Sequence, residues 1–169
     1  GTKMHYHQRA LLIILCGLLC ACMVLATQVY RGARRDTEEV NNLICTAKSN
    51  VYIKSRKLIL SGTLVLDLKS NRIAIHYAVQ DQQREQRLFF QDITISAPNR
   101  IGPKTYTFRI EAVHKFDSDT TGEMFSWLRL LQPATVNELT INKVGQRTYL
   151  FSLNRQIYNF CTTSGSTKA

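Results

Sequence analysis

The chain has 169 residues, and its 22 Lys and Arg against 12 Asp and Glu give a formal net charge of +10. This basic excess first suggests nucleic acid as a partner. Five of the basic residues flank one apolar segment, however, and residues 36–169 carry 17 basic and 12 acidic groups, spread along the chain. Because they form no arginine run and no aromatic RNA-binding signature, direct nucleic-acid binding is not expected. About 130 residues follow the apolar segment and its flank, enough for one domain with a core and too few for two.

The apolar segment, residues 10–29, carries no charged side chain from Ala10 to Ala26. Its length reaches the about 20 residues that a helix needs to cross roughly 30 Å of hydrocarbon, so it predicts a transmembrane helix. Two alternatives stay open: a cleaved secretory signal, and a lipoprotein signal at Leu19-Cys20-Ala21-Cys22. The favoured arrangement makes residues 1–9 a short cytoplasmic tail and residues 30–44 a juxtamembrane connector.

Small side chains recur within the predicted span. Gly17 and Ala21 stand four residues apart, and such residues let two membrane helices approach closely. We therefore consider Gly17 and Ala21 a possible helix–helix contact, with mere tolerance of lipid as the alternative. The span also holds three cysteines, Cys16, Cys20 and Cys22.

The orientation of the span is decided by cysteine usage. The positive-inside count alone slightly favours the opposite orientation, because three arginines follow the span. Cys45 and Cys161 are the only cysteines outside it, near opposite ends of the remaining chain, as an end-to-end disulfide would require. Disulfides persist in oxidising compartments, so we expect residues 45–169 to be an extracytoplasmic domain, with two unrelated buried thiols as the alternative. The arginines after the span, expected to contact lipid phosphates, are Arg31, Arg34 and Arg35.

From Cys45 onward, apolar residues alternate with polar ones, which is the period of a half-buried β-strand. Short turns such as residues 69–72 separate the alternating stretches, so neighbouring strands are expected to be antiparallel. The fold class predicted is mainly β (α+β): a curved antiparallel sheet or small lipocalin-like barrel with one or two helices. After a first strand that starts at Cys45, the strands predicted are residues 58–68, 73–79, 87–97, 106–116, 136–144 and 148–160.

Two segments predict helices. Residues 36–44 have early acids and later apolar residues, which favours a short helix that continues or follows the span. Thr120-Thr121-Gly122-Glu123 has the spacing of a capping box, and the apolar residues after it fall on one helical stripe until Gln132-Pro133. This second helix is expected to cover one mouth or face of the sheet. The stripe consists of Met124, Trp127, Leu128 and Leu131.

One face of nearly every predicted strand is apolar, so the barrel interior is either a filled core or a small ligand cavity. Small barrels usually fill their interiors with side chains, and we expect the filled core. The alternative is a cavity for an apolar molecule such as a fatty acid or bile salt. Its lining would include Leu60, Leu64, Ile75, Tyr77, Phe108 and Ile110.

Motifs for catalysis are missing from the sequence outside the span. It has no Gly-x-Ser-x-Gly elbow, no His-Glu-x-x-His, no phosphate-binding glycine loop and no Cys-x-x-Cys. Asp117-Ser118-Asp119 resembles part of a calcium loop, but the glycine and the final glutamate are not where that loop needs them, so turn chemistry explains it better. We expect no enzyme activity, metal or cofactor.

The layout resembles the FidL-like inner-membrane proteins of enteric bacteria, which include the MyfF and PsaF co-regulators of fimbrial genes. The resemblance covers the chain from Met4 and includes Leu60-Ser61-Gly62-Thr63-Leu64 and a cysteine near each end of a small β-rich domain. These proteins are similar in role to ToxS, which pairs in the inner membrane with a ToxR-like transcription activator.

The resemblance implies a membrane-anchored periplasmic accessory protein or co-regulator that stabilises such an activator. It would relay envelope signals to virulence or fimbrial genes, and Cys45 and Cys161 would form a structural disulfide. The competing hypothesis is a periplasmic sensor or carrier of the small apolar ligand.

Co-regulators of this kind act where acidity changes, and histidine titrates in that range. His114 falls on the same predicted strand face as Phe108, Ile110 and Phe116, which predicts that it is buried. His76 falls on the face opposite Ile75 and Tyr77, which predicts that it is exposed. Burial disfavours the charged form, which makes His114 a possible pH sensor. The alternative is a packed histidine without a signalling role.

Overall fold

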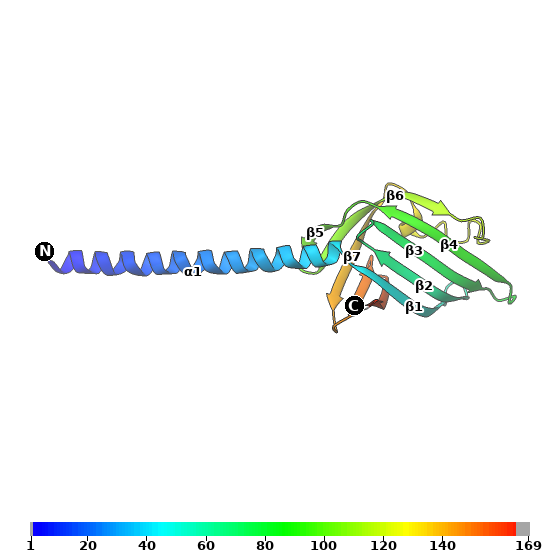
Figure 1. Ribbon diagram of the computed structural model, residues 1–169, viewed down its shortest axis with the longest axis horizontal. Helices are drawn as coiled ribbons and strands as arrows, with labels where there is room; N and C mark the ends of the chain where they lie inside the picture. The colour runs from blue at the N-terminus through cyan, green and yellow to red at the C-terminus, as the bar shows by residue number, and fades with distance from the viewer. Residues whose placement is uncertain (1, 165–169) are drawn as a thin grey trace. The chain divides into compact units, whose positions relative to one another are not determined.

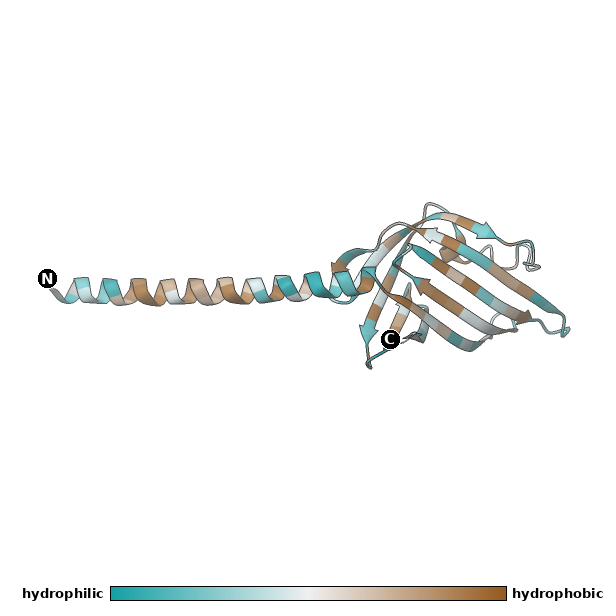
Figure 2. Ribbon diagram, in the orientation of Figure 1, coloured by the Kyte–Doolittle hydropathy of each residue, from teal (hydrophilic) through white to brown (hydrophobic). Residues whose placement is uncertain are grey.

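The computed structural model describes residues 2–164, so residue 1 of the predicted tail and residues 165–169 of the predicted domain lie outside it. The chain divides into two units between Glu39 and Val40 (Figure 1). The first unit is the helix α1 (Thr2–Asn41), whose middle is apolar (Figure 2). The segment His5–Asn41 is long and apolar enough to cross a membrane, and none of its most apolar window is buried. The predicted connector, residues 30–44, continues this helix only as far as Asn41, and its last residue, Ile44, begins the first strand.

The second unit is a β-barrel with one short 3-10 helix, η1 (Arg129–Leu131). Its strands follow the period-two stretches of the sequence, and several of the turns hold a non-glycine residue in the left-handed region, as at Asn71 and Lys104. The strands are β1 (Ile44–Ile53), β2 (Leu58–Asp67), β3 (Arg72–Gln80), β4 (Gln86–Ile95), β5 (Asn99–Gly102), β6 (Thr105–Lys115), β7 (Val136–Lys143), β8 (Thr148–Leu153) and β9 (Ile157–Thr163).

Pairing is antiparallel throughout, in the order β4-β3-β2-β1-β9-β8-β7-β6-β5. An additional pairing of β4 with β6 closes eight strands into a ring, and β5 forms a hairpin with β6. Closure leaves β5 as a short extra strand, and each strand of the ring pairs with two neighbours, although β1 and β9 do so at only two residue pairs. The prediction of a mainly β, barrel-like domain behind one apolar helix is therefore confirmed.

Apolar side chains from every strand of the ring point into the barrel, and Figure 2 shows the resulting alternation along the strands. The core begins at Val40 and Leu43, just before β1, and none of the described side chains before Val40 belongs to it. Most of the interior is a filled core, as expected for a small barrel. Its largest fully buried side chains include Tyr106, Phe151, Leu66, Ile73, Ile93 and Leu139.

A glycine sets the close approach of β2 and β3. Gly62 lies in register between Ser49 on β1 and Tyr77 on β3, and the Tyr77 hydroxyl reaches across β2 to the Ser49 hydroxyl, at 2.9 Å. A Cβ atom on Gly62 would stand 2.1 Å from the carbonyl oxygen of His76 and 2.7 Å from the Cα of Tyr77. Only glycine fits there, because both contacts are with backbone.

A bulge in β6 overturns the predicted burial of His114. Thr94 pairs with Ala112 and Ile95 pairs with Ile110, so the residue between them on β6 has no partner of its own. The extra residue reverses the inside and outside faces, since side chains alternate along a strand. Ile110 is buried, whereas His114 is exposed beside Phe116, with 4.6 Å between ring centres. The exposure predicted for His76 is confirmed.

Three other local predictions differ from the structure. Where the sequence predicts a helix, residues 122–127 form consecutive turns that are followed by η1. The hydroxyl of Thr120 accepts the Leu88 N–H instead of capping a helix, and Gly122 has a left-handed backbone, with φ +57. Residues 148–160 form a hairpin, β8–β9, around Asn154 and Arg155, both with positive φ. Residues 98–105, left between two predicted strands, contain the short strand β5.

The ring closes weakly at the seam between β1 and β9. These strands pair only at Cys45 with Thr163 and at Thr46 with Thr162, although β1 pairs with β2 along its whole length. Farther along β9, the Phe160 N–H is bonded by the side chain of Asn159. A disulfide joins Cys45 to Cys161, with 5.4 Å between their Cα atoms, so the predicted disulfide is confirmed. This covalent link holds the two strands together where hydrogen bonding ends.

Gly62→Ala is expected to destabilise the barrel by about 3 kcal/mol or more, because the added Cβ overlaps backbone atoms of β3 that cannot move independently. The control is Gly102→Ala, since an added Cβ there meets nothing within 4 Å. Thermal melting of both variants, followed by circular dichroism, measures the difference. Equal melting temperatures for the two variants would contradict the close approach at Gly62.

Candidate functional site

One end of the barrel interior holds a cavity of about 290 Å³, here called the apolar pocket. Inward-facing residues of β1 to β4 form one wall, the start of β9 continues it beside β1, and the segment 121–131, here called the cover segment, contributes the remaining apolar lining. The pocket is thus bounded partly by the unpaired portion of the seam. Its lining consists of Val51, Ile53, Leu60, Leu64, Ile75, Tyr77, Phe89, Phe125, Trp127, Leu128, Leu130, Gln156 and Ile157.

Four of the six residues predicted to line a cavity do so: Leu60, Leu64, Ile75 and Tyr77. Phe108 and Ile110 do not, since they lie on β6 in the filled part of the core, where each is at most 2% exposed. The interior is thus both a filled core and a cavity.

Polar groups are scarce in the apolar pocket. The hydroxyl of Tyr77 is bonded to that of Ser49, and Gln156 stands at the edge. Because the Tyr77 hydroxyl already has its partner in Ser49, the remaining surface of the pocket is almost wholly apolar. Gly62 makes this hydrogen bond possible, because the Tyr77 side chain passes over Gly62 of β2 to reach Ser49 on β1.

Aromatic contacts hold the cover segment against the barrel. Phe125 is buried and packs edge-to-face on Phe89 of β4, with 5.1 Å between ring centres. Trp127 is partly exposed, donates its indole N–H to the Met124 carbonyl, and lies under the guanidinium of Arg56, 4.6 Å from the ring centre. A cation–π contact of this kind joins the β1–β2 turn to the cover segment. The expected role of this region, covering one mouth, is met by turns instead of a helix.

The start of the cover segment is fixed by Asp119, whose side chain is fully buried. One carboxylate oxygen accepts the backbone N–H and the hydroxyl of Thr121, and the other accepts the Phe90 N–H and the Gln91 amide. Burial raises the pKa of Asp119, but these hydrogen bonds, led by the Thr121 hydroxyl, outweigh it and hold the pKa below the usual value. Turn chemistry thus accounts for the Asp117-Ser118-Asp119 sequence.

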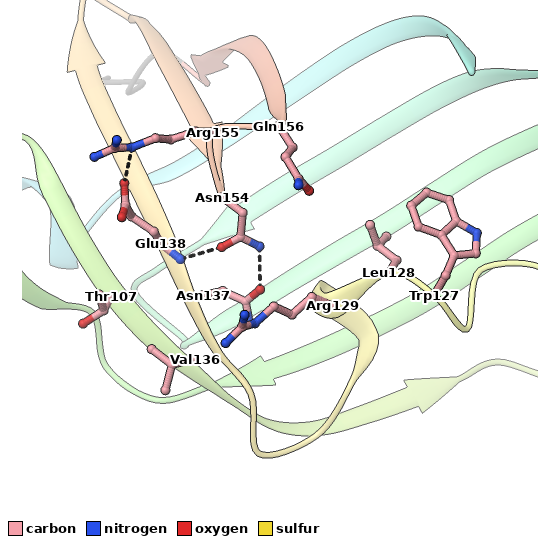
Figure 3. Close-up of a pocket in the computed structure, with 10 residues that line it drawn as sticks. All are labelled: Thr107, Trp127, Leu128, Arg129, Val136, Asn137, Glu138, Asn154, Arg155 and Gln156. Carbon is pink, nitrogen blue, oxygen red and sulfur yellow. Dashed lines mark hydrogen bonds and ion pairs between the residues drawn. The ribbon is translucent and has the colours of Figure 1, made fainter. Parts of the chain in front are cut away.

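A second cavity, here called the polar groove, lies beside the cover segment and has a volume of about 770 Å³ (Figure 3). It is open to solvent, and its walls come from η1, β7 and the β8–β9 turn. Its lining consists of Thr107, Trp127, Leu128, Arg129, Val136, Asn137, Glu138, Asn154, Arg155 and Gln156.

A hydrogen-bond network built on the β8–β9 turn shapes the polar groove. The amide of Asn154 accepts the Glu138 N–H at 2.8 Å and donates to the Asn137 amide oxygen at 2.7 Å (Figure 3). The carboxylate of Glu138 pairs with Arg155 at 3.0 Å. Arg129 forms no ion pair with any residue in the part of the chain that the structure describes.

Other predicted sites lie apart from these cavities. His114 is on the outside of β6, opposite Asp92 of β4, and its exposure removes the basis for a buried pH sensor. Gly17 and Ala21 lie on the exposed surface of α1. Among residues 2–164, no group of three or more His, Cys, Asp or Glu side chains could hold a metal ion.

Sequence reasoning missed several lining residues. Val51 and Ile53 continue the period-two pattern of β1 and could have been found from it. Ile157 was hidden because residues 148–160 read as one strand, and Trp127 was assigned to a helical stripe. The polar groove has no signal in the sequence, because its residues come from segments far apart in the chain.

Comparisons with protein-family models, with curated proteins and with solved structures found no match to this chain.

Asp119→Asn is expected to lower the free energy of unfolding by about 2 kcal/mol at neutral pH, because the bonds to a charged acceptor are lost. The folded-state pKa of Asp119 is lowered, so its contribution is complete above the unfolded value of about 3.9 and is lost as pH falls through the folded value. The destabilisation caused by Asp119→Asn, measured from melting curves, should therefore be smaller at pH 2.5 than at pH 7. Asp117→Asn, at an exposed neighbour, is the control. An equal deficit for Asp119→Asn at both pH values would contradict this assignment.

Proposed function

We propose that this protein is a membrane-anchored, extracytoplasmic binding module whose barrel takes up a small apolar ligand. The apolar pocket carries this proposal: a cavity of about 290 Å³, lined almost entirely by aliphatic and aromatic side chains, opens at the end of an otherwise filled barrel. Ligand sites are typically concave and apolar, with a few placed polar groups, and this volume stands at the small end of their range.

Two features support the proposed location. The helix α1 is long and apolar enough to span a membrane, and the Cys45–Cys161 disulfide indicates an oxidising compartment for the barrel. A bacterial inner membrane with the barrel in the periplasm accommodates both. The resemblance to the FidL-like proteins favours the same location.

The test uses the full chain in phosphatidylcholine vesicles, with emission from Trp127, the only tryptophan of the chain and a lining residue of the pocket. Decanol, a linear apolar chain with a small uncharged head, should shift this emission saturably. Leu64→Phe fills the pocket and should abolish the shift, whereas Leu88→Phe, at an exposed position of β4, should preserve it. Circular dichroism confirms that both variants are folded. The same response in the native protein and in folded Leu64→Phe would overturn the proposal.

A second role, as an accessory subunit of a ToxR-like transcription activator, is favoured by one observation on α1. Gly17 and Ala21 stand four residues apart on a helix whose most apolar 18-residue stretch has no buried residue. The face that carries these two small residues is therefore available to another membrane helix. Such an accessory subunit could relay occupancy of the apolar pocket to its partner. The two roles are compatible.

Replacing Gly17 and Ala21 together with leucine should reduce co-purification with a ToxR-like partner by several-fold, since larger side chains keep the helices apart. The matched control is Ala26→Leu, also in α1 but outside this pair. Both variants are expressed beside the tagged partner and recovered from detergent extracts. Equal recovery of the double variant and the control would exclude the Gly17–Ala21 face from the contact.

A further inference from the structure

We infer that the ligand of this barrel is an amphiphile whose apolar chain lies in the apolar pocket while its anionic head group lies in the polar groove. This inference rests on the proposed function and adds the chemical class of the ligand and the residues that select its head. It follows from three observations: the two cavities share three lining residues, the groove has an uncompensated positive charge, and two of the three shared residues, Trp127 and Leu128, are apolar.

The two cavities adjoin each other, since three residues line both of them: Trp127, Leu128 and Gln156. Figure 3 shows them at one end of the groove, with Trp127 and Leu128 on the cover segment and Gln156 on the turn before β9. A molecule that crosses this boundary is in contact with apolar side chains on one side and with polar ones on the other.

The boundary itself suits an alkyl chain. The only polar atom of the Trp127 indole, its N–H, is bonded to the Met124 carbonyl, so the ring offers apolar surface to a ligand. Within the described residues, the side-chain amide of Gln156 forms no hydrogen bond, which leaves it available to the first polar group of a head.

The charge of the polar groove selects the head group. Its lining contains two arginines and one carboxylate, and Arg155 is already paired with Glu138 at 3.0 Å. Arg129 remains without an ion pair among the described residues, and a guanidinium binds carboxylate, sulfate or phosphate oxygens through two parallel hydrogen bonds. A cationic head would be repelled there, and an uncharged head would leave the charge uncompensated.

A further arginine strengthens the positive charge at the boundary. Arg56 lies over the Trp127 ring, 4.6 Å from its centre, and Trp127 also lines the groove that contains Arg129. The neighbouring Lys54 and Lys57 of the β1–β2 turn are exposed and have no ion pair among the described residues. The approach to the pocket therefore favours anions, and it should do so less at high salt.

The inference is tested with probes of equal chain length and different head: decanoate, decanol and decyltrimethylammonium. The full chain in phosphatidylcholine vesicles is titrated with each, and Trp127 emission is recorded. Decanoate should bind about tenfold more tightly than decanol, the ratio that 1.4 kcal/mol corresponds to, and decyltrimethylammonium more weakly than either. High salt should reduce the preference for decanoate.

Arg129→Gln combined with Arg155→Gln should remove the preference for decanoate over decanol. Arg147→Gln, in the β7–β8 turn outside both cavities, is the matched control and should retain the preference. Equal binding of decanoate and decanol to the native protein would overturn this inference, and so would an undiminished preference in the folded double variant. Either result would still allow the apolar pocket to bind an uncharged ligand. Failure of every probe to bind would overturn the proposed function as well.

Discussion

The closure of the barrel between its first and last strands is the constraint on which the rest of this structure depends. Only two residue pairs join β1 to β9, and the Cys45–Cys161 disulfide, which spans 116 positions in the sequence, secures the same place. In the chain-entropy model such a link contributes about 4 to 5 kcal/mol, by restricting the unfolded chain. Beyond the link the two strands have no pairing, and there Val51, Ile53 and Ile157 line the apolar pocket. The same seam thus both closes the barrel and bounds its cavity.

The interior is divided between a filled core and the apolar pocket. On the β6 side, side chains such as Phe108 and Ile110 fill the barrel, whereas on the β1–β3 side the interior stays partly open under the cover segment. That segment has little regular structure of its own, and the buried carboxylate of Asp119 and the contact of Phe125 with Phe89 fix it. Local opening costs less free energy where backbone bonds are few, so the cover segment is the part of the barrel best suited to admit a ligand.

Much of this architecture is readable in the sequence, because period-two alternation, turn residues and two lone cysteines are local signals. The barrel, the disulfide and four cavity residues follow from them. Three things do not. The bulge in β6 is set by pairing with β4 and reverses the face on which His114 lies. The turn at Asn154 needs two left-handed residues that are not glycine. The polar groove joins η1, β7 and the β8–β9 turn, which only the closed barrel brings together.

The central claim, that the Cys45–Cys161 disulfide holds the barrel closed around its pocket, is tested most directly by hydrogen exchange of the full chain with and without a reducing agent. Peptide mass mapping in the same experiment identifies the Cys45–Cys161 link before reduction. The account predicts that reduction accelerates exchange first in β1 and β9, while β2, β3 and β4 stay protected because their ladders are complete. Free thiols at both positions before reduction, or unchanged exchange in β1 and β9 after it, would contradict the account.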